Sequence, residues 1–229
     1  YNTGAVTGTG AKNGVGGIVG RLSSAVSSYS NGKITGCLNT GAVTATSGTA
    51  AGAIVGQKTT ANAAITRSYF KAGTCTQAIG GNPADGDEAA LATEAECGSK
   101  RLIGLLGGAF AAGSDGKLTL DWQDPAAKPV VTFVTPEGAA VTIEGQTPAE
   151  PGVFVLENGT YSYSVSKQGY NTATGSVTVN GESQRVDVNL GVETFSVTFN
   201  VTTPGAKITV TDAAGETIQP TAENANVYS

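Results

Sequence analysis

Hydrophobic residues in the first seventy positions stand in short steps that are separated by glycine and asparagine. Such steps occur at Val6, at Val15 and at residues 18–19. Each step is long enough for one strand of about three or four residues. Glycine tolerates positive φ angles, so it suits the corners between such strands. The pattern therefore predicts short strands joined by sharp corners.

These steps repeat along the chain. Residues 1–7 and 38–44 are identical at six of seven positions, and residues 17–20 are echoed by 53–56. A weaker third start follows at residues 69–74. A period of 36–37 residues is typical of stacked arrays, in which each unit buries its apolar face against its neighbours. We predict a β-solenoid over residues 1–72, with inward Val and Ile stacked along an axis.

The repeated motif reads Asn-Thr-Gly-x-Val, followed by Gly-Gly-Ile-Val-Gly. It stands at residues 2–6 with 16–20, and at residues 39–43 with 52–56, where Ala53 replaces the second glycine. This motif resembles the GLUG-type repeats of bacterial surface proteins. The resemblance implies a large secreted or cell-surface protein, and many members of that family are adhesin-like.

Residues 73–124 are less regular, and we predict that they cap the open end of the solenoid. Residues 84–96 are rich in Ala and Glu, with acids near the start, and form the best helix candidate in the chain. Residues 118–122 are expected to form a short strand that bears the only Trp. A cap is needed because the last turn of an array otherwise exposes its core and strand edges.

Alternating apolar and polar positions begin after a proline-flanked linker at residues 124–129. Asn158-Gly159 and Asn180-Gly181 are strong hairpin turns between short strands. Six strands of this length and spacing predict a small antiparallel β-sandwich over residues 125–191. The fold class is therefore all-β and multi-domain, with a short β-solenoid, a mixed capping region and antiparallel β-sandwich modules.

Residues 136–139 read Pro-Glu-Gly-Ala, the motif after which the PEGA family is named. Together with residues 159–161 and Lys167-x-Gly169-Tyr170, this segment resembles that family. The resemblance implies an extracytoplasmic β-sandwich that serves as a spacer or interaction module and has no catalytic residues.

Residues 192–229 resemble a partial second copy, because residues 197–199 echo residues 131–133. Either the copy is truncated, or another chain supplies its missing strands.

Charge and composition narrow the function classes. The net charge is −5 and the Lys and Arg residues are scattered, which argues against nucleic acid or an anionic membrane surface as a partner. No apolar run approaches the roughly 20 residues of a membrane-spanning helix, so we expect no membrane span here. Because the chain starts inside a repeat, we expect it to be a piece of something longer.

Histidine is absent, which removes Ser-His-Asp and Cys-His nucleophiles and every His-ligated zinc site. We therefore predict no catalytic, cofactor-binding or metal-binding residues and no cofactor. Residues 85–88 (Asp-Gly-Asp-Glu) could bind calcium but are better suited to cap a helix. Tyr161 and Tyr163 share one strand face, which is expected to enter the sandwich core rather than stack on sugars.

Three cysteines remain to be placed. Cys75 and Cys97 enclose a loop of 23 residues and are a possible disulfide, while three reduced, buried thiols are the alternative. Cys37 aligns with Ser68 of the next unit, so we expect it to be a small core residue.

The function expected from these features is that of a non-catalytic cell-surface stalk or adhesin-like region. It would be extracellular, at a bacterial surface or secreted, and would present or form a surface for a glycan or protein of a host or bacterial surface. One alternative is an accessory region of a secreted peptidase or glycan-degrading enzyme. Another is a fibre subunit that self-associates through its partial C-terminal module and is completed by strand donation.

Overall fold

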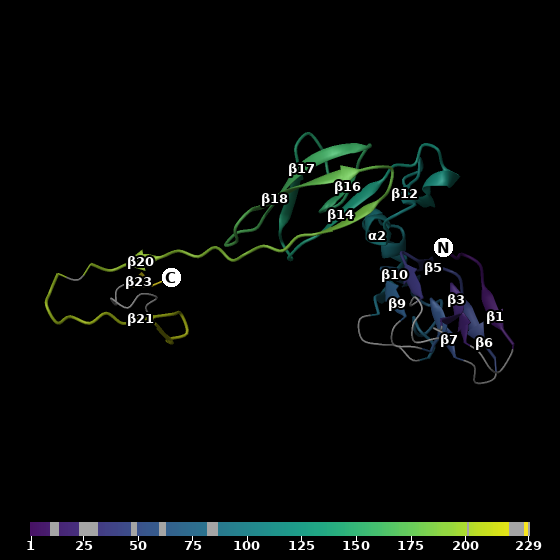
Figure 1. Cartoon of the computed structure of the whole chain (residues 1–229), viewed down its shortest axis with the longest axis horizontal. Helices are drawn as coiled ribbons and strands as arrows, with labels where there is room; N and C mark the ends of the chain where they lie inside the picture. Colours follow the sequence, from purple (N-terminus) through teal and green to yellow (C-terminus); the bar gives the residue numbers. More distant parts are fainter. Residues whose placement is uncertain are drawn as a thin grey trace.

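The computed structural model describes residues 1–9, 14–22, 32–46, 50–59, 63–81, 87–200, 202–219 and 227–228. This part of the chain consists mainly of short strands arranged in many small sheets, and it contains two α-helices. The predicted all-β, multi-domain class is confirmed. Figure 1 shows stacked strands at the N-terminal end, a sandwich in the middle and an extended C-terminal arm.

The repeat in sequence is a repeat in structure. The first turn holds β1 (Val6–Gly8), β2 (Val15–Gly16), β3 (Val19–Leu22), β4 (Lys33–Thr35) and β5 (Leu38–Asn39). The second holds β6 (Val43–Ala45), β7 (Ala51–Gly52), β8 (Val55–Lys58), β9 (Ala64–Thr66) and β10 (Ser68–Lys71). Each strand pairs in parallel with its equivalent in the other turn, so that Val6 faces Val43 and Ile34 faces Ile65.

A third turn continues the stack beyond the predicted boundary at residue 72. The amides of Ala53 and Ile54 donate to the carbonyls of Gln77 and Ala78 at 2.8 and 2.9 Å. Strand β11 (Ala89–Ala92) then pairs in parallel with β10. The helix predicted over residues 84–96 is therefore wrong at residues 89–92. The unpaired edge of β10 offers these residues a row of hydrogen bonds, which outweighs the high helix propensity of Ala and Leu.

Polar side chains inside the stack also repeat from turn to turn. Asn39 is fully buried, and its Oδ1 accepts a hydrogen bond of 2.7 Å from Nδ2 of Asn2. Each asparagine also closes its own Asn-Thr-Gly turn by accepting from the amide of Gly4 or Gly41. The interior also holds an apolar cluster that includes Ile54, Ile65 and Phe70, together with their neighbours.

Two short helices and a hairpin follow the stack: α1 (Glu94–Cys97), α2 (Lys100–Leu106), β12 (Phe110–Ala112) and β13 (Leu118–Leu120), with a 3-10 turn at Asp121–Gln123. The capping region thus has two helices where one was predicted. Helix α2 lies between the stacked strands and the sandwich (Figure 1). One apolar cluster joins Leu38 of the stack, Leu102 and Leu106 of α2, and Val130 and Val153 of the sandwich.

The segment predicted as a linker, residues 124–129, forms backbone hydrogen bonds with the capping region. The amide of Ala112 donates to the carbonyl of Lys128, and the amide of Lys128 donates to the carbonyl of Ala112, both at 2.9 Å. The carboxylate of Glu150 in the sandwich accepts hydrogen bonds from the amides of Lys100 and Arg101, which begin α2. Because these contacts cross the predicted boundary, the sandwich and the capping region form one continuous body.

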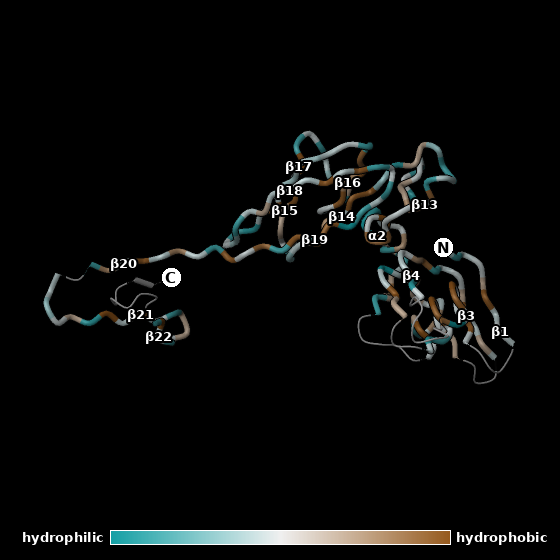
Figure 2. The backbone as a smooth tube through the Cα atoms, viewed as in Figure 1, coloured by the Kyte–Doolittle hydropathy of each residue, from teal (hydrophilic) through white to brown (hydrophobic). Residues whose placement is uncertain are grey.

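The sandwich has the six strands expected from the alternating pattern. One sheet has the order β16 (Val153–Val155), β14 (Val130–Val134), β19 (Gln184–Asp187), and the other the order β15 (Ala140–Ile143), β17 (Gly159–Ser166), β18 (Ala173–Val179). The prediction of a purely antiparallel module is wrong for one pair, because β14 and β19 are parallel. Val131, Phe133 and Phe154 lie in a core shared by both sheets, and Figure 2 shows hydrophobic positions gathered there.

The C-terminal arm carries two small antiparallel pairs, β20 (Val197–Thr198) with β23 (Val227–Tyr228) and β21 (Val210–Thr211) with β22 (Thr217–Ile218). Val197 and Phe199 are 51% and 36% exposed, whereas their sequence equivalents Val131 and Phe133 are 0% and 1% exposed. The apolar face that is buried in the first module is therefore exposed in the second.

Candidate functional site

One corner of the stack carries different residues in each turn. Gly36, Arg67 and Glu88 occupy this corner in the first, second and third turns, as the neighbouring strand pairings show. Gly36 has a φ of +60°, and Arg67 has a φ of +47°. Among the described residues, Arg67 is the one non-glycine residue with a positive φ. Such a conformation is costly for a residue with a Cβ, and it often marks a functional position.

Two further arginines reach the same junction from other elements. The hydroxyl of Thr132 in β14 donates to the carbonyl of Arg101 in α2 at 3.0 Å, and Thr132 is paired with Arg185 in β19. Arg101 and Arg185 therefore flank the same threonine. The chain has four arginines, and only Arg21 lies elsewhere, in strand β3.

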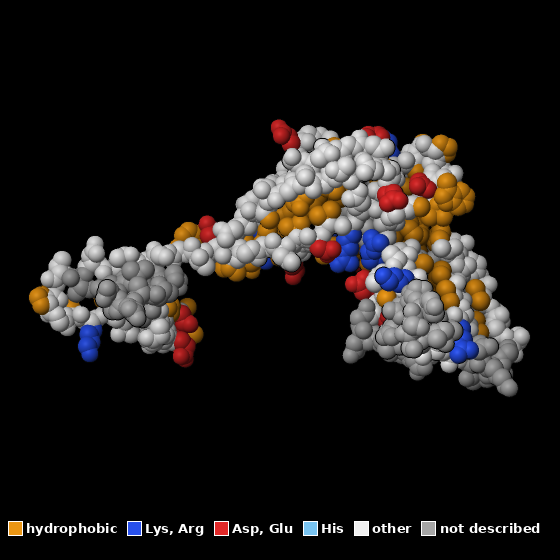
Figure 3. Space-filling view, in the orientation of Figure 1, with side chains coloured by type: hydrophobic (Ala, Val, Ile, Leu, Met, Phe, Trp, Pro, Cys, Tyr) orange, Lys and Arg blue, Asp and Glu red, His pale blue; other side chains and the backbone are white. Residues whose placement is uncertain are grey.

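The guanidinium of Arg67 approaches this junction from the stack. A Cβ on Gly107, directly after α2, would lie 3.1 Å from its Nη1 and 3.2 Å from the carbonyl oxygen of Ser183. Ser183 is two residues before Arg185, so the strand that carries Arg185 passes close to the guanidinium of Arg67. Figure 3 shows basic side chains gathered between the sandwich and the strand stack. We call Arg67, Arg101 and Arg185 with Tyr69 the arginine junction.

Tyr69 of β10 is the aromatic member of the arginine junction. Burial raises the pKa of its hydroxyl, and the charges of Arg185, Arg101 and Arg67 act in the opposite direction, while Glu88 raises this pKa further. The phenol is therefore within electrostatic reach of all three guanidinium groups. It stays protonated at neutral pH and can donate a hydrogen bond.

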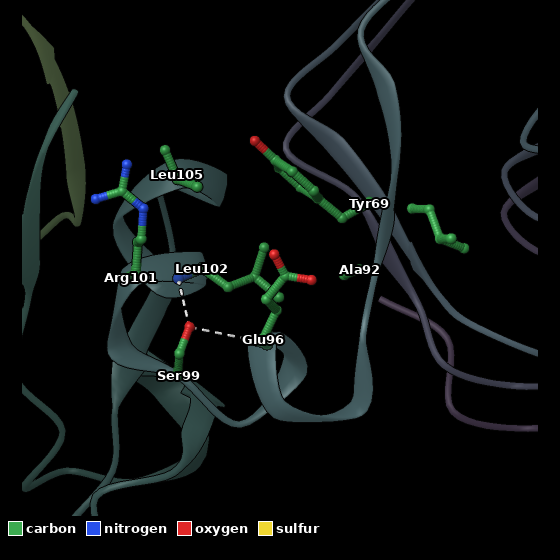
Figure 4. A pocket seen from close by; sticks show the side chains of 8 residues that line it. Tyr69, Ala92, Glu96, Ser99, Arg101, Leu102 and Leu105 are labelled. Atoms are coloured by element: carbon green, nitrogen blue, oxygen red, sulfur yellow. Dashed lines mark hydrogen bonds between the residues drawn. The ribbon is translucent and has the colours of Figure 1, made fainter. Parts of the chain in front are cut away.

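Tyr69 and Arg101 line a pocket of about 70 Å³ between β10, β11 and the two helices. Figure 4 shows Tyr69, Glu96 and Leu102 around the same space, with Ser99 and Arg101 at the start of α2. A second hollow of about 230 Å³ lies where α2 ends and is lined by Arg67, Leu106 and Gly107, among others. Tyr69 and Arg101 thus border the first hollow and Arg67 borders the second, while Arg185 is not among the residues that line either one.

The charges of the arginine junction are only partly neutralised. Asp187 accepts hydrogen bonds from Nη2 and Nε of Arg185 at 2.8 and 2.9 Å. Glu88 accepts a hydrogen bond from the backbone amide of Arg67 at 3.2 Å. Within the described ranges, the guanidinium groups of Arg67 and Arg101 have no hydrogen bond or ion pair to another side chain. Glu96 lines the pocket together with Arg101 and is a third carboxylate, so acidic and basic groups here are equal in number.

The sequence predicted no such site, because Arg67, Arg101 and Arg185 are far apart in the chain. The scattered Lys and Arg residues argued only against nucleic acid and an anionic membrane surface as partners. The repeat offered one sequence signal for an unusual residue at this place, because Arg67 stands where the preceding unit has Gly36.

Of the two possibilities left open for the cysteines, the structure has the reduced thiols and not the Cys75–Cys97 disulfide. Cys37, Cys75 and Cys97 are free thiols. Cys75 packs against the cluster inside the stack, whereas Cys97 packs against the cluster around α2. Burial raises the pKa of the Cys37 and Cys97 thiols, so both are weak nucleophiles at neutral pH. Cys37 occupies the position of Ser68, as the repeat predicted.

The structure describes only the second half of the acidic segment at residues 85–88. Asp85 and Gly86 lie outside the described residues. Asp87 forms a buried ion pair with Lys58, with Nζ at 2.7 and 2.8 Å from the two carboxylate oxygens. Among the residues that the structure describes, no group of three His, Cys, Asp or Glu side chains is arranged to hold a metal ion.

The tyrosines of β17 lie where the alternation placed them. Tyr161 and Tyr163 pack against the sandwich core, and Tyr163 meets Phe133 edge-on with ring centroids 4.9 Å apart. Tyr170 lies under the ammonium of Lys167 at 4.7 Å. The prediction that Tyr161 and Tyr163 belong to the core is confirmed.

No helix in the described part of the chain has the length and apolar character required to cross a membrane.

No curated protein matches the sequence. A family model does match part of it: residues 133–194 match the PEGA domain. The segment therefore resembles this surface-associated, extracytoplasmic β-domain, and the match covers five of the six strands of the sandwich and the end of β14.

Proposed function

We propose that this chain is a non-catalytic region of a cell-surface protein, which holds a binding surface away from its point of attachment. The observation that carries the proposal is the apolar cluster that runs from Leu38 through α2 to Val130 and Val153. Because α2 packs against both neighbours, the stack and the sandwich keep one orientation. A spacer needs this property if it is to present a surface in a defined direction. The PEGA match supports an extracytoplasmic location.

The location can be tested on intact source cells. Antibodies raised against this chain should label the surface of unbroken cells, and externally added protease should remove the label. Antibodies against a cytoplasmic protein are the control and should label only broken cells. Labelling restricted to broken cells would overturn the proposal.

An accessory region of a secreted enzyme is the first alternative. The full open reading frame separates the two, because an adjacent catalytic domain favours the enzyme and an anchoring signal favours the surface protein. The same proposal includes three further statements: the stacked repeats are of the GLUG type, the protein is bacterial, and its surface serves adhesion.

A fibre subunit is the second alternative, and one observation favours it. Val197 and Phe199 expose the apolar face that Val131 and Phe133 bury in the first module. A strand from another chain would cover this face by the kind of strand addition known from other recognition modules. Sedimentation over a concentration series should then show growing multimers, and a constant monomer would exclude this alternative.

A further inference from the structure

We propose that the hollow at the end of α2 binds a small carboxylic acid with a compact apolar body, and that the guanidinium of Arg67 receives its carboxylate. The inference names a ligand class for the binding surface of the proposed function and rests on that function. Three features carry it: the unused donors of Arg67, the strained backbone of this residue, and the otherwise uncharged lining of the hollow.

The hollow of about 230 Å³ lies where the stack meets the end of α2. Two corners of the stack, Gly36 and Arg67, supply one part of its lining. Leu106 at the end of α2 and the chain that leads from Gly107 into β12 supply the rest. Leu106 and Phe110 are buried, so this part of the wall belongs to the packed interior and keeps its shape.

The guanidinium of Arg67 lies at this wall with its donors unused. Its Nη1 is 3.1 Å from the place where a Cβ would stand on Gly107, so the glycine leaves room for it. Among the described residues, no oxygen accepts a hydrogen bond from this guanidinium, and Glu88 binds the backbone amide of Arg67 instead. A planar guanidinium matches the two oxygens of a carboxylate and binds it with paired hydrogen bonds.

The sign of charge in the hollow is uniform. Arg67 is the one charged residue among the described residues that line it. The pocket at Arg101 differs in this respect, because Glu96 lines it as well. A hollow with a single positive charge and no acid in its wall attracts an anion, and one guanidinium matches one carboxylate.

Arg67 stands at a corner where the fold favours glycine. The equivalent corner in the first turn is Gly36, and the φ angles of the two residues are +47° and +60°. Glycine performs the same turn 31 residues earlier without the penalty of a Cβ, so the stack itself does not require an arginine here. Such strain is retained most readily where the side chain has a task, and binding an anion in the hollow is a task of this kind.

The rest of the hollow is suited to carbon atoms. Its volume is roughly that of seven or eight water molecules in the liquid, which is more than a carboxylate group alone fills. The hydroxyl of Thr35 already shares a hydrogen bond of 2.8 Å with the next turn, and the amides of Gly36 and Gly108 donate to carbonyls at 3.1 and 2.9 Å. The remaining side chains, Leu106, Ala109 and Phe110, are apolar. The ligand that fits therefore joins one carboxylate to an apolar body.

The test uses the full chain, with ¹⁵N-labelled arginine side chains observed by NMR. Phenylacetate is the probe, phenylacetamide is the match that lacks the charge, and acetate is the match that lacks the apolar body. We expect a saturable shift of the Nε–Hε signal of Arg67 with phenylacetate, and at least about tenfold weaker binding of phenylacetamide and acetate. The signal of Arg21 should not move, and that of Arg101 should move less than that of Arg67.

Variants make the assignment specific. Arg67→Gln and Arg67→Gly should each weaken phenylacetate binding by at least about tenfold, while the matched Arg21→Gln should bind as the parent does. Glycine suits the backbone at this corner, so the backbone NMR spectrum of Arg67→Gly should remain that of the folded chain.

Several results would overturn the inference: no saturable shift with phenylacetate, equal affinity for phenylacetamide or acetate, a larger shift at Arg101 than at Arg67, or an equal loss in Arg21→Gln. Surface labelling that fails while phenylacetate still binds would instead refute the proposed function and leave the site standing. Labelling that succeeds without phenylacetate binding would refute the site and leave the function standing.

Discussion

At the corner of the second turn, Arg67 adopts a backbone conformation that Gly36 adopts in the first. Parallel pairing of Thr35 with Thr66 and of Leu38 with Tyr69 forces the two corners to be alike. The repeat therefore imposes a left-handed conformation on whatever residue stands there. The positive φ of Arg67 therefore lowers the stability of the fold, and a substitution can measure by how much.

Arg67→Gly should leave the free energy of unfolding unchanged or raise it by up to about 1.6 kcal/mol. Removing Cβ from a left-handed residue relieves about 1–2 kcal/mol. The greater freedom of glycine in the unfolded chain offsets about 0.4–1 kcal/mol of this. Urea denaturation measures the difference. Arg21→Gly in strand β3, where φ is not positive, should be destabilising and serves as the control; an equal loss in both variants would contradict the prediction.

Glu96 gives a prediction on pH. Its hydrogen bonds from the backbone and hydroxyl of Thr93 lower the pKa of its carboxyl below the ordinary value of 4.5. A carboxyl whose pKa is lower in the folded state stabilises the fold above its unfolded pKa, and this contribution is lost as the pH falls through the folded pKa.

A ¹³C NMR titration of the Glu96 carboxyl should therefore show its midpoint below 4.5. Thr93→Val should move the midpoint back toward 4.5, because it removes the hydroxyl donor. An unchanged midpoint in Thr93→Val would show that the hydroxyl does not contribute.

Among the elements, α2 depends most on its surroundings. It has seven residues, too few for a stable isolated helix, and its first amides are satisfied by Glu150 from the sandwich. Gly104 lies where α2 approaches β14 closely. The helix therefore exists because the stack and the sandwich hold it between them.

Gly104→Ala should lower the free energy of unfolding by about 1–3 kcal/mol, although alanine is the better helix former. Its Cβ would lie 2.3 Å from Oγ1 of Thr132 and 2.8 Å from the Thr132 amide nitrogen. Urea denaturation measures the loss. Gly98→Ala after α1 is the control, since its nearest atom would be 3.5 Å away; a similar loss there would refute the steric explanation.

The ion pair between Lys58 and Asp87 joins β8 to the third turn. Lys58 is 1% exposed and Asp87 is 7% exposed. Asp87→Asn should cost about 3–5 kcal/mol, because it leaves a buried ammonium without its countercharge. Lys58→Met combined with Asp87→Leu should recover part of that loss, as measured by thermal unfolding. If the double variant is as unstable as the single one, the charge pair is not the cause.

The molecule as a whole has a well-packed part and an extended part. The stack, α2 and the sandwich share continuous apolar contacts, whereas the described residues after 191 run out along an extended arm (Figures 1 and 2). The arm keeps Phe195 at 70% exposure and Val197 at 51%, so no comparable core holds it to the sandwich.

Small-angle scattering should therefore give a radius of gyration clearly above about 17 Å, the value expected of one compact domain of this length. The elongated arrangement of stack, sandwich and arm is the physical reason. A chain that ends at residue 191 should have a smaller radius and serves as the comparison. A full-chain value near 17 Å would mean that the arm folds back.

Local patterns sufficed for the parts of the fold that repeat or alternate. The motif at residues 2–6 and 39–43 predicted that equivalent residues lie over one another, because identical side chains stack in register only when the turns are parallel. Period-2 alternation in residues 161–166 predicted a strand with its tyrosines in the core. The hairpins predicted at Asn158-Gly159 and Asn180-Gly181 are wrong, because β16 and β17, like β18 and β19, lie in different sheets, so each segment crosses between the sheets.

Only the tertiary structure decided the third turn, the position of α2, the partner of Lys58 and the arginine junction. Residues 89–92 have the composition of a helix, and the open edge of β10 made them a strand. Arg67, Arg101 and Arg185 lie on three separate segments that pack around Thr132 and Gly107. The sequence by itself determined which segments resemble one another, since resemblance is local information. Which unlike segments touch depends on packing between residues far apart in the chain, and no local pattern carries that information.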